Sequence, residues 1–367
     1  MSFYLCVDCG GSKTSAVVCD ASGKILGRAL GGSSNFAYMS VSAFTDAVRV
    51  AVSNAAKTIV SPPSIEPVAL PPATPLFAAA WFGISGVDSP QAVANASAAL
   101  SALLGIPVGD RLLVANDTHL LAAPLRLHID ITHAITAIAG TGSCVVSFRQ
   151  QPSGHLEELA RTGGWGWILG DEGGGFHVGR ETIRQIMDDA ARESLGIPSA
   201  RHSALKEAVL ARFGITGIEN AAEVLPVIHL PEPSLTVDAM PQVPAYLLVA
   251  REKRLSQLSP LVFEAAFGPE RDPFALGVLR SCAGALADQI AMLGGSVGNG
   301  ERAPRAVDAG EAVLCFGGSL VGVKDYRDLV LDELKKRGHV FRYVEFVDDA
   351  AAIGAVGLAS LFESLGA

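Results

Sequence analysis

Short, largely apolar runs separated by glycine and polar turns dominate the first thirty residues of the chain. Each run is shorter than an ordinary helix, and together they predict an antiparallel three-strand meander over residues 3–9, 14–20 and 24–30. A longer periodic stretch from about residue 41 to 60 predicts a helix that follows the meander.

Beyond the meander, the pattern alternates between strands and helices. Residues 77–84 and 111–115 are predicted strands. Ser89-Pro90 begins a helix that Gly105 ends, because proline fits a first helical turn and glycine fits the residue after the last. The proline-rich residues 61–75 suit neither a helix nor a central strand, so they are predicted to form an exposed connection.

The meander is partly repeated over residues 134–161. A broken helical stretch, about 174–293, follows it, and residues 294–310 are predicted to be a mobile surface loop because they lack apolar periodicity. A strand over 312–316 then enters a glycine turn, and a helix over 324–336 leaves it.

This order predicts an α/β fold with two related domains around a central cleft. Residues 1–125 form the first domain, and the last helix, within 350–367, returns to it. Residues 126–349 form the second domain, which contains the helical insertion.

The two meanders share a glycine and hydroxyl turn, and this turn is the first candidate for chemistry. The turns are Asp8-Cys9-Gly10-Gly11-Ser12-Lys13 and Gly140-Thr141-Gly142-Ser143-Cys144. Glycine lets backbone N–H groups approach an anion closely, and the hydroxyls add hydrogen-bond donors. Two such hairpins could clamp one polyphosphate, and Asp8 could contact a phosphate-bound Mg²⁺, which prefers oxygen ligands.

Asp117 follows a predicted strand and opens a short helix. Asn116, Asp117 and Thr118 all qualify as the helix N-cap, so capping alone could explain the carboxylate. The carboxyl ends of parallel strands are, however, where open α/β sheets bind ligands. A carboxylate there could accept the proton of a hydroxyl that attacks the γ-phosphate.

Residues 163–175 combine seven glycines with two tryptophans and two adjacent acids. Linkers rarely contain tryptophan, so a close-packed binding loop is predicted instead. In such a loop an indole offers a flat face to a sugar ring, and Asp171 can accept hydrogen bonds from hydroxyls, while Glu172 could cap the following helix.

The composition of the chain limits which binding partners can be expected. The net charge is −9 and no sustained basic run occurs, which argues against nucleic acid and anionic membranes as partners. No apolar run was found that reaches the roughly 18 residues of a membrane span, and the N-terminus does not resemble a signal peptide. The six scattered cysteines are predicted to be reduced core residues of a cytosolic protein.

Together these motifs resemble the N-acetylglucosamine kinase family, in the BadF/BadG-type ATPase branch of the actin-like, hexokinase-type superfamily. The resemblance covers the whole chain and is sharpest at six segments: 8–14, 33–35, 116–117, 140–143, 163–173 and 317–319. It implies two ribonuclease-H-like (actin-like ATPase) domains around a cleft, ATP and Mg²⁺ as cofactors, and a cytoplasmic homodimer.

The resemblance also implies residue roles. Asp117 is the general base, and Asp8 is the metal-side carboxylate. Substrate-binding positions are Asn35, Ser85, Asp117, Ser143, Cys144, Gly164, Trp165, Gly166 and Asp171. Nucleotide-binding positions are Gly10, Gly11, Ser12, Lys13, Gly140, Thr141, Gly142, Gly317, Gly318 and Ser319. Cys144 departs from the family pattern, because animal members have an asparagine there.

The function expected from the resemblance is ATP-dependent phosphorylation of N-acetyl-D-glucosamine at its 6-hydroxyl. Glucosamine and N-acetylmannosamine remain alternative substrates. Two other classes stay open: an ATPase that activates a radical dehydratase through an iron–sulfur cluster, and a catalytically inactive sugar sensor.

Overall fold

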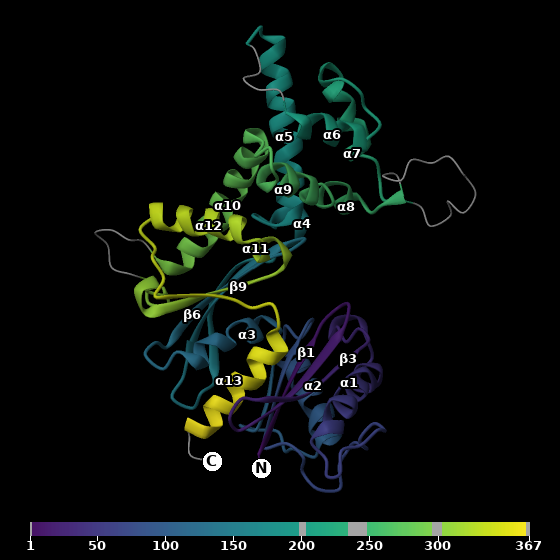
Figure 1. Ribbon diagram of the computed structural model, residues 1–367, viewed down its shortest axis with the longest axis vertical. Helices are drawn as coiled ribbons and strands as arrows, with labels where there is room; N and C mark the ends of the chain where they lie inside the picture. Colours follow the sequence, from purple (N-terminus) through teal and green to yellow (C-terminus); the bar gives the residue numbers. More distant parts are fainter. Residues whose placement is uncertain (1, 198–202, 234–247, 296–302, 365–367) are drawn as a thin grey trace, which may run out of the picture.

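The computed structural model describes residues 2–197, 203–233, 248–295 and 303–364. They form two α/β domains, each built on a five-stranded sheet (Figure 1). The strands are β1 Phe3–Cys9, β2 Thr14–Asp20, β3 Ile25–Gly31, β4 Ala79–Ile84, β5 Leu112–Ala115, β6 His133–Ala139, β7 Ser143–Gln150, β8 Leu156–Gly163, β9 Ala312–Gly317 and β10 Tyr343–Phe346.

The helices cover the faces of the sheets and make up the insertion. The α-helices are α1 Val41–Ala55, α2 Pro90–Leu104, α3 Thr118–Leu121, α4 Gly166–Leu169, α5 Gly175–Ser194, α6 Ala204–Arg212, α7 Val224–Ile228, α8 Arg251–Ser256, α9 Ser259–Phe267, α10 Pro273–Gly294, α11 Ser319–Gly322, α12 Lys324–Lys336 and α13 Ala350–Ser364. A 3₁₀ helix, η3 Ala123–Leu127, joins the two domains.

Both sheets have the same topology. The first runs β3-β2-β1-β4-β5 and the second β8-β7-β6-β9-β10. In each, three antiparallel strands form the meander. A fourth strand pairs in parallel with the first strand of the meander, and a fifth pairs in parallel with the fourth. The duplicated meander predicted from the chain is therefore confirmed, and so is the α/β fold with two related domains.

Helix ends follow the residues that predict them. Ser89 caps α2 by accepting a hydrogen bond from Ala92 N at 3.2 Å, Pro90 is its first residue, and Gly105 closes it with φ +68°. Asp272 caps α10 in the same way through Phe274 N and Ala275 N.

The buried side chains form three clusters. One lies between the first sheet and helices α1 and α2, and another lies between the second sheet and helices of the insertion. The third combines side chains from both sheets with α3, η3 and α13. Helix α13 packs against β1 and β2, so the end of the described chain returns to the first sheet, close to the N-terminus (Figure 1).

Helix α10 bears on the expectation that no segment is long and apolar enough for a membrane span. Pro273–Gly294 is long and apolar enough to span a membrane by length and composition alone. About half of the apolar window is buried inside the protein, where the helix packs against α5, α9 and α12. Its apolar character is that of a core helix in the second domain.

Two other segments differ from expectation or lie outside the description. The strand β10 was not predicted; it pairs in parallel with β9, at the edge of the second sheet as the described residues form it. Of the predicted mobile loop over 294–310, residues 296–302 lie outside the described residues. The described remainder includes a short 3₁₀ turn, Ala309–Glu311, and the buried Val307.

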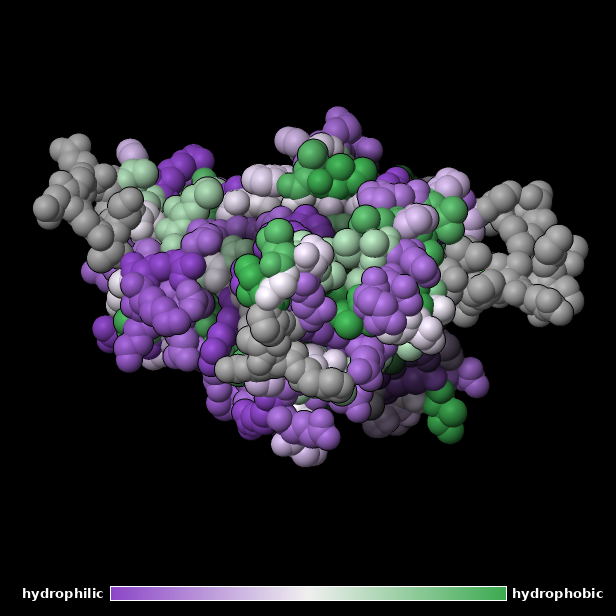
Figure 2. Space-filling model, turned by 90° about the horizontal axis from the view of Figure 1, so that it is seen from above, coloured by the Kyte–Doolittle hydropathy of each residue, from purple (hydrophilic) through white to green (hydrophobic). Residues whose placement is uncertain are grey.

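The helical insertion forms the end of the molecule farthest from the first sheet (Figure 1). Seen from that end, hydrophobic residues form several separate patches among hydrophilic ones (Figure 2). Such scattered patches are ordinary for the surface of a globular protein.

Candidate functional site

Three candidate residues meet where parallel strands of the first sheet end. Asp8 lies near the end of β1, Ser85 directly follows β4, and Asp117 follows β5 by two residues. Gly83 lies between Asp8 and Ala115, with which it pairs in the sheet. Because it has no side chain, the backbone at Asp117 can approach closely: a Cβ on Gly83 would lie 3.2 Å from Asp117 Cα. The Ser85 hydroxyl donates a hydrogen bond to Asp117 Oδ2.

Asn116, and not Asp117, satisfies the start of helix α3. Its Oδ1 accepts from Thr118 N at 3.1 Å and from Thr118 Oγ1 at 2.8 Å, while its Nδ2 donates to Asp88 Oδ1 at 2.8 Å. Asp117 makes no side-chain capping bond. The Asp117 carboxylate is therefore held by the Ser85 hydroxyl and not by the helix.

Asn35 links the first glycine turn to the Ser85 loop. A Cβ on Gly11 would lie 3.9 Å from Asn35 Nδ2, and Phe36 N donates to Ser85 O at 2.9 Å. Gly86 has φ +82° and leaves no space for a side chain, because its Cβ would lie 2.6 Å from Asn35 Oδ1. Asn35, Ser85 and Asp117 thus lie at one edge of the first sheet.

The first hairpin turn places Asp8 in an unfavourable electrostatic setting. Gly10 N donates to Lys13 O at 3.0 Å to close the turn, and Gly10 O accepts from Ser34 N at 3.0 Å. The pKa of Asp8 is raised from 3.8 to about 6, chiefly by burial and next by the neighbouring Asp117 carboxylate, while Lys13 opposes the change. Asp8 therefore holds its proton more tightly than an exposed aspartate does, and a nearby cation would favour its ionised form.

The second hairpin turn meets the third glycine turn. Gly140 N donates to Gly142 O at 2.9 Å and closes the hairpin. Gly318 has φ +100°, and a Cβ on it would lie 2.6 Å from Ala139 O. Ser319 Oγ lies 3.9 Å from the Cβ position of Gly140. Two of the three predicted nucleotide-binding segments are thus in contact, at the carboxyl ends of β6 and β9.

Replacing Gly318 with alanine is expected to lower both stability and nucleotide affinity. An alanine there would have to adopt a positive φ, and its Cβ would clash with a backbone carbonyl. Together these effects cost about 1–3 kcal/mol or more. Thermal unfolding and nucleotide titration measure the two effects.

Gly277→Ala is the matched control. Gly277 lies inside α10, and no neighbouring atom outside its own helix backbone was found within 4 Å of its Cβ position among the described residues, so this change should raise stability slightly. Equal behaviour of the two variants would contradict the assignment.

The glycine and tryptophan loop is attached to the second hairpin. Gly175 N donates to Gly140 O at 2.8 Å, and Phe176 N donates to Thr141 O at 3.0 Å. Asp171, in a left-handed conformation with φ +63°, accepts Ser143 N at 3.1 Å through Oδ1. The Asp171 carboxylate thus already has a partner within the protein.

The expected close packing of this loop holds for only part of it. Trp167 packs against Phe176, with ring centroids 5.4 Å apart, but Trp165 is 63% exposed, and Ile168 and Leu169 of α4 are also exposed. Gly164 N donates to Ser143 O at 2.8 Å. Cys144 is half-buried, and its Sγ lies 3.1 Å from the Cβ position of Gly164.

Glu172 does not cap the helix that follows the loop. Helix α5 begins at Gly175 and its N-cap, Gly174, makes no side-chain capping bond. The Glu172 carboxylate instead accepts hydrogen bonds from Arg180 Nη2 at 2.8 and 2.9 Å and lies 3.0 Å from His177 Nδ1.

A pocket of about 620 Å³ between the domains contains residues that the sequence did not single out. The first domain contributes Asp88 and Asn116, and β8 of the second contributes Glu158 and Arg161, which form an ion pair at 3.0 Å. His119, on α3, also lines it, and burial lowers its pKa to about 4. The charged residues Glu158 and Arg161, on the strand that leads into the glycine loop, were the feature of the sequence from which this pocket could have been predicted.

The structure does not bring all the predicted residues together. Gly10, Gly11, Ser12 and Lys13 belong to the first sheet, and Gly140, Thr141 and Gly142 belong to the second. Within the described residues, no hydrogen bond joins the two hairpin turns. Asn116, next to Asp117, lines the same pocket as Arg161 of β8 in the second sheet. Burial is the main cause of the raised pKa of the Cys144 thiol.

Comparisons with solved structures support the fold. A protein from Porphyromonas gingivalis designated a candidate N-acetylglucosamine kinase aligns over 100% of both chains, with a TM-score of 0.58 and 21% identity. A similarly designated protein from Chromobacterium violaceum aligns over 99% of this chain and 98% of its own, with a TM-score of 0.53 and 22% identity.

Comparisons of sequence extend this result. The N-acetyl-D-glucosamine kinase of Dictyostelium discoideum is 25% identical over 268 residues, which are 72% of this chain and 70% of that one. An N-acetylmuramic acid/N-acetylglucosamine kinase of Clostridium acetobutylicum is 34% identical over 77 residues, 21% of this chain and 22% of that one. Residues 5–362 match one family throughout. The chain belongs to the BadF/BadG/BcrA/BcrD ATPase family.

Proposed function

We propose that the chain is an ATP-dependent sugar kinase that phosphorylates N-acetyl-D-glucosamine at its 6-hydroxyl. Membership in an ATPase family supports the use of ATP. The names of the Dictyostelium and Clostridium relatives support an amino sugar as the acceptor. The single observation that carries the proposal is the Asp117 carboxylate, which lies at the ligand-binding edge of the first sheet without a capping role.

In this proposal Asp117 is the general base. The sugar 6-oxygen forms a bond to the γ-phosphorus, the bond between that phosphorus and the β–γ bridging oxygen breaks, and the hydroxyl proton passes to Asp117. The hydrogen bond from Ser85 orients the carboxylate. ADP leaves with the electron pair of the broken bond.

The glycine turns supply the phosphate side. Backbone N–H groups of residues 10–13 and 140–142 would approach the phosphates, and Gly317, Gly318 and Ser319 would lie near the nucleoside. Mg²⁺ fits beside Asp8, because a cation relieves the repulsion between Asp8 and Asp117 that helps raise the Asp8 pKa. No group of three or more potential metal ligands occurs in the described part of the chain, and Mg²⁺ on a nucleotide needs only one or two carboxylates. When bound, the ion would neutralise charge on the transferring phosphoryl group.

The acceptor would lie between the domains. Asn35 and Ser85 line the edge of the first sheet, and the exposed Trp165 indole offers a flat face for a sugar ring. Gly164 and Gly166 allow close approach of the loop. Asp171, in the glycine and tryptophan loop, accepts a hydrogen bond from Ser143 N of the second hairpin, and it is proposed to accept further hydrogen bonds from hydroxyls of the sugar.

A coupled ADP-release assay over a panel of amino sugars tests the proposal. N-acetylglucosamine should give the largest kcat/KM, and glucosamine should give a much lower one. Polar groups of the protein that hydrogen-bond the acetamide would have no partner when the sugar carries a free amine. N-acetylmannosamine and N-acetylmuramic acid complete the panel. Failure of every sugar to raise ADP release above the sugar-free rate would overturn the proposal and favour a sugar sensor.

The structure disfavours the dehydratase activator. All six cysteines lie within the described residues: five are buried, and Cys144 is half-buried. A cluster shared between two subunits needs thiolates at the surface. An iron assay on the purified protein should therefore find no stoichiometric iron, and stoichiometric iron with sulfide would revive the alternative.

We also propose that the protein is a cytoplasmic homodimer, as the resemblance implies. Light scattering coupled to size-exclusion chromatography measures the mass directly. A mass near 38.0 kDa would indicate a monomer and contradict the dimer.

A further inference from the structure

A buried arginine without a counter-ion lies beside a second pocket, away from Asp117. Arg126, in η3, is only 6% exposed. Its guanidinium carbon lies 4.0 Å from the centre of the Trp81 ring, and Nη2 donates to Gly154 O at 3.2 Å. Nε and Nη1 have no hydrogen-bond partner, and no carboxylate pairs with this side chain within the described ranges.

This arrangement is costly. Moving a guanidinium out of water costs several kcal/mol unless charge and hydrogen bonds compensate. The cation–π contact and one carbonyl compensate only part of that cost. Burial lowers the pKa of Arg126 to about 10, which expresses the same penalty. By contrast Arg254, which is also buried, donates to two backbone carbonyls, Leu230 O at 2.6 Å and Pro231 O at 2.8 Å.

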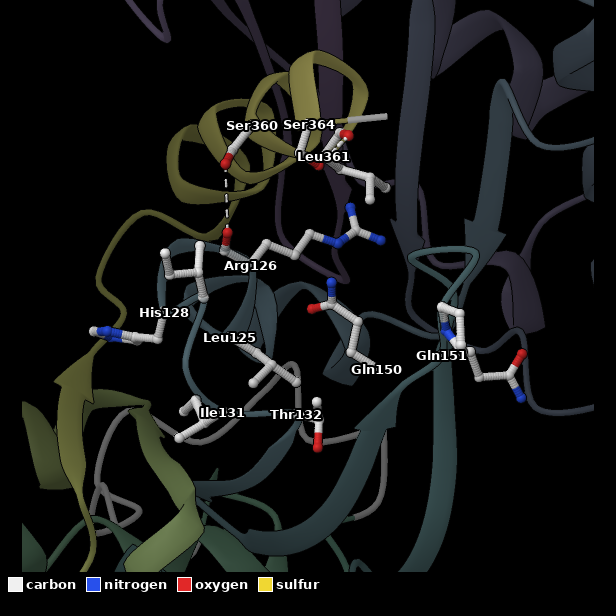
Figure 3. A pocket seen from close by; sticks show the side chains of 12 residues that line it. Leu125, Arg126, His128, Ile131, Thr132, Gln150, Gln151, Ser360, Leu361 and Ser364 are labelled. Atoms are coloured by element: carbon white, nitrogen blue, oxygen red, sulfur yellow. Dashed lines mark hydrogen bonds between the residues drawn. The ribbon is translucent and has the colours of Figure 1, made fainter. Parts of the chain in front are cut away.

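The adjoining pocket has the composition of an anion site. Its volume is about 340 Å³, and Arg126 is among its lining residues. The other polar lining residues are neutral or basic, and none is acidic: His128, Thr132, Gln150, Gln151, Ser360 and Ser364. Figure 3 shows the Arg126 side chain extending between α13 and the side chain of Gln150, whose amide points toward it.

The walls of the pocket come from both domains and from the segment that joins them. Arg126 lies on η3, Gln150 ends β7 of the second sheet, and Ser360 belongs to α13, which packs on the first sheet. Ser360 Oγ donates to Arg126 O at 3.4 Å, which ties α13 to the joining segment (Figure 3). A ligand here would contact η3, the segment that joins the domains, and not the Asp117 site.

We propose that this pocket binds a small oxyanion, a phosphate or carboxylate group, held by the Arg126 guanidinium and the Gln150 amide. The bound anion provides the missing counter-ion and contacts elements of both domains at once. It thereby stabilises one arrangement of the domains, which makes the pocket a regulatory site of the two-domain enzyme. The binding claim is independent of the proposed sugar kinase activity.

Calorimetric titration of the full chain with inorganic phosphate and, separately, with acetate tests the proposal. A saturating, non-hydrolysable ATP analogue with Mg²⁺ blocks the hairpin turns, so that the anion reports on other sites. We expect saturable binding of at least one anion by the wild type, and the two titrations distinguish phosphate from carboxylate as the preferred group.

Variants then locate the binding. Arg126→Gln should weaken it about a hundredfold, and Gln150→Ala about tenfold, because a charge-assisted hydrogen bond contributes more than a neutral one. Arg254→Gln, which changes a buried arginine outside the pocket, is the control and should bind like the wild type. If Arg126→Gln does not fold, Gln150→Ala decides. Absence of binding by the wild type, or unchanged affinity in the pocket variants, would overturn the proposal.

Discussion

Replacing Asp117 with asparagine is expected to lower kcat about a thousandfold and to leave the affinity for ATP close to that of the wild type. General bases contribute roughly 10²–10⁴-fold to turnover, and asparagine cannot accept the hydroxyl proton. The change keeps the size of the side chain and an oxygen for the Ser85 hydroxyl, and it removes no helix cap, because Asn116 performs that role. Steady-state kinetics and nucleotide titration measure the two quantities.

Asp88→Asn is the matched control for this prediction. Asp88 is also a carboxylate at the inter-domain pocket, where it accepts a hydrogen bond from the Asn116 amide, whereas the Ser85 hydroxyl donates to Asp117. An asparagine there can still present an oxygen to Asn116, so kcat should change only a few-fold. If Asp117→Asn kept turnover within tenfold of the wild type, or if both variants lost it equally, Asp117 would not be the base.

The contrast between Asn116 and Asp117 illustrates a limit of sequence analysis. Both residues, and Thr118 after them, suit the start of a helix, and spacing alone does not divide the roles. The backbone decides: Asn116 Oδ1 reaches Thr118 N, and the Asp117 carboxylate reaches the Ser85 hydroxyl instead. Ser85 is more than thirty positions away along the chain, so only the parallel pairing of β4 with β5 brings the two together.

The fold was more predictable because its signals are local. The glycine turns at residues 10–11 and 140–142, flanked by apolar runs, predicted the two meanders that became two sheets of the same topology. Ser89, Pro90 and Gly105 predicted both ends of α2. By contrast, β10 covers only Tyr343–Phe346 and pairs with one neighbour, so its four residues carry too weak a pattern to predict a strand.

Residues whose role depends on packing between distant segments were missed or only partly predicted. Glu158 and Arg161 look like an exposed ion pair along one strand, and only the packing of the domains places them beside Asn116. Arg126 gives no local sign that it is buried over Trp81. Helix α10 has the length and composition of a membrane span, and only its neighbours in the second domain identify it as a core helix.

Replacing Asp8 with asparagine is expected to stabilise the ligand-free protein at neutral pH and to abolish its Mg²⁺-dependent activity. Burial, followed by repulsion from Asp117, raises the pKa of Asp8 from 3.8 to about 6. The folded protein therefore holds this proton more tightly than the unfolded chain does. Below about pH 4 the side chain is protonated in both states, and the wild type and the variant should differ little.

As the pH rises from about 4 to about 6, the unfolded chain loses this proton first, so the free energy of unfolding of the wild type should fall relative to the variant. Above pH 6 the difference should level off at up to about 3 kcal/mol, the value that corresponds to a shift of about two pKa units. Urea unfolding between pH 4 and 8, without nucleotide or Mg²⁺, measures it.

Asp110→Asn, at an exposed position, removes the same charge and should give no such pH-dependent gain. Superimposable stability curves for Asp8→Asn and the wild type would contradict the buried, repelled carboxylate. A gain in stability with full retention of turnover would instead show that the Asp8 carboxylate destabilises the fold and has no role in catalysis. Loss of turnover together with the gain would mean that the protein keeps a destabilising carboxylate because the cation on its nucleotide requires one.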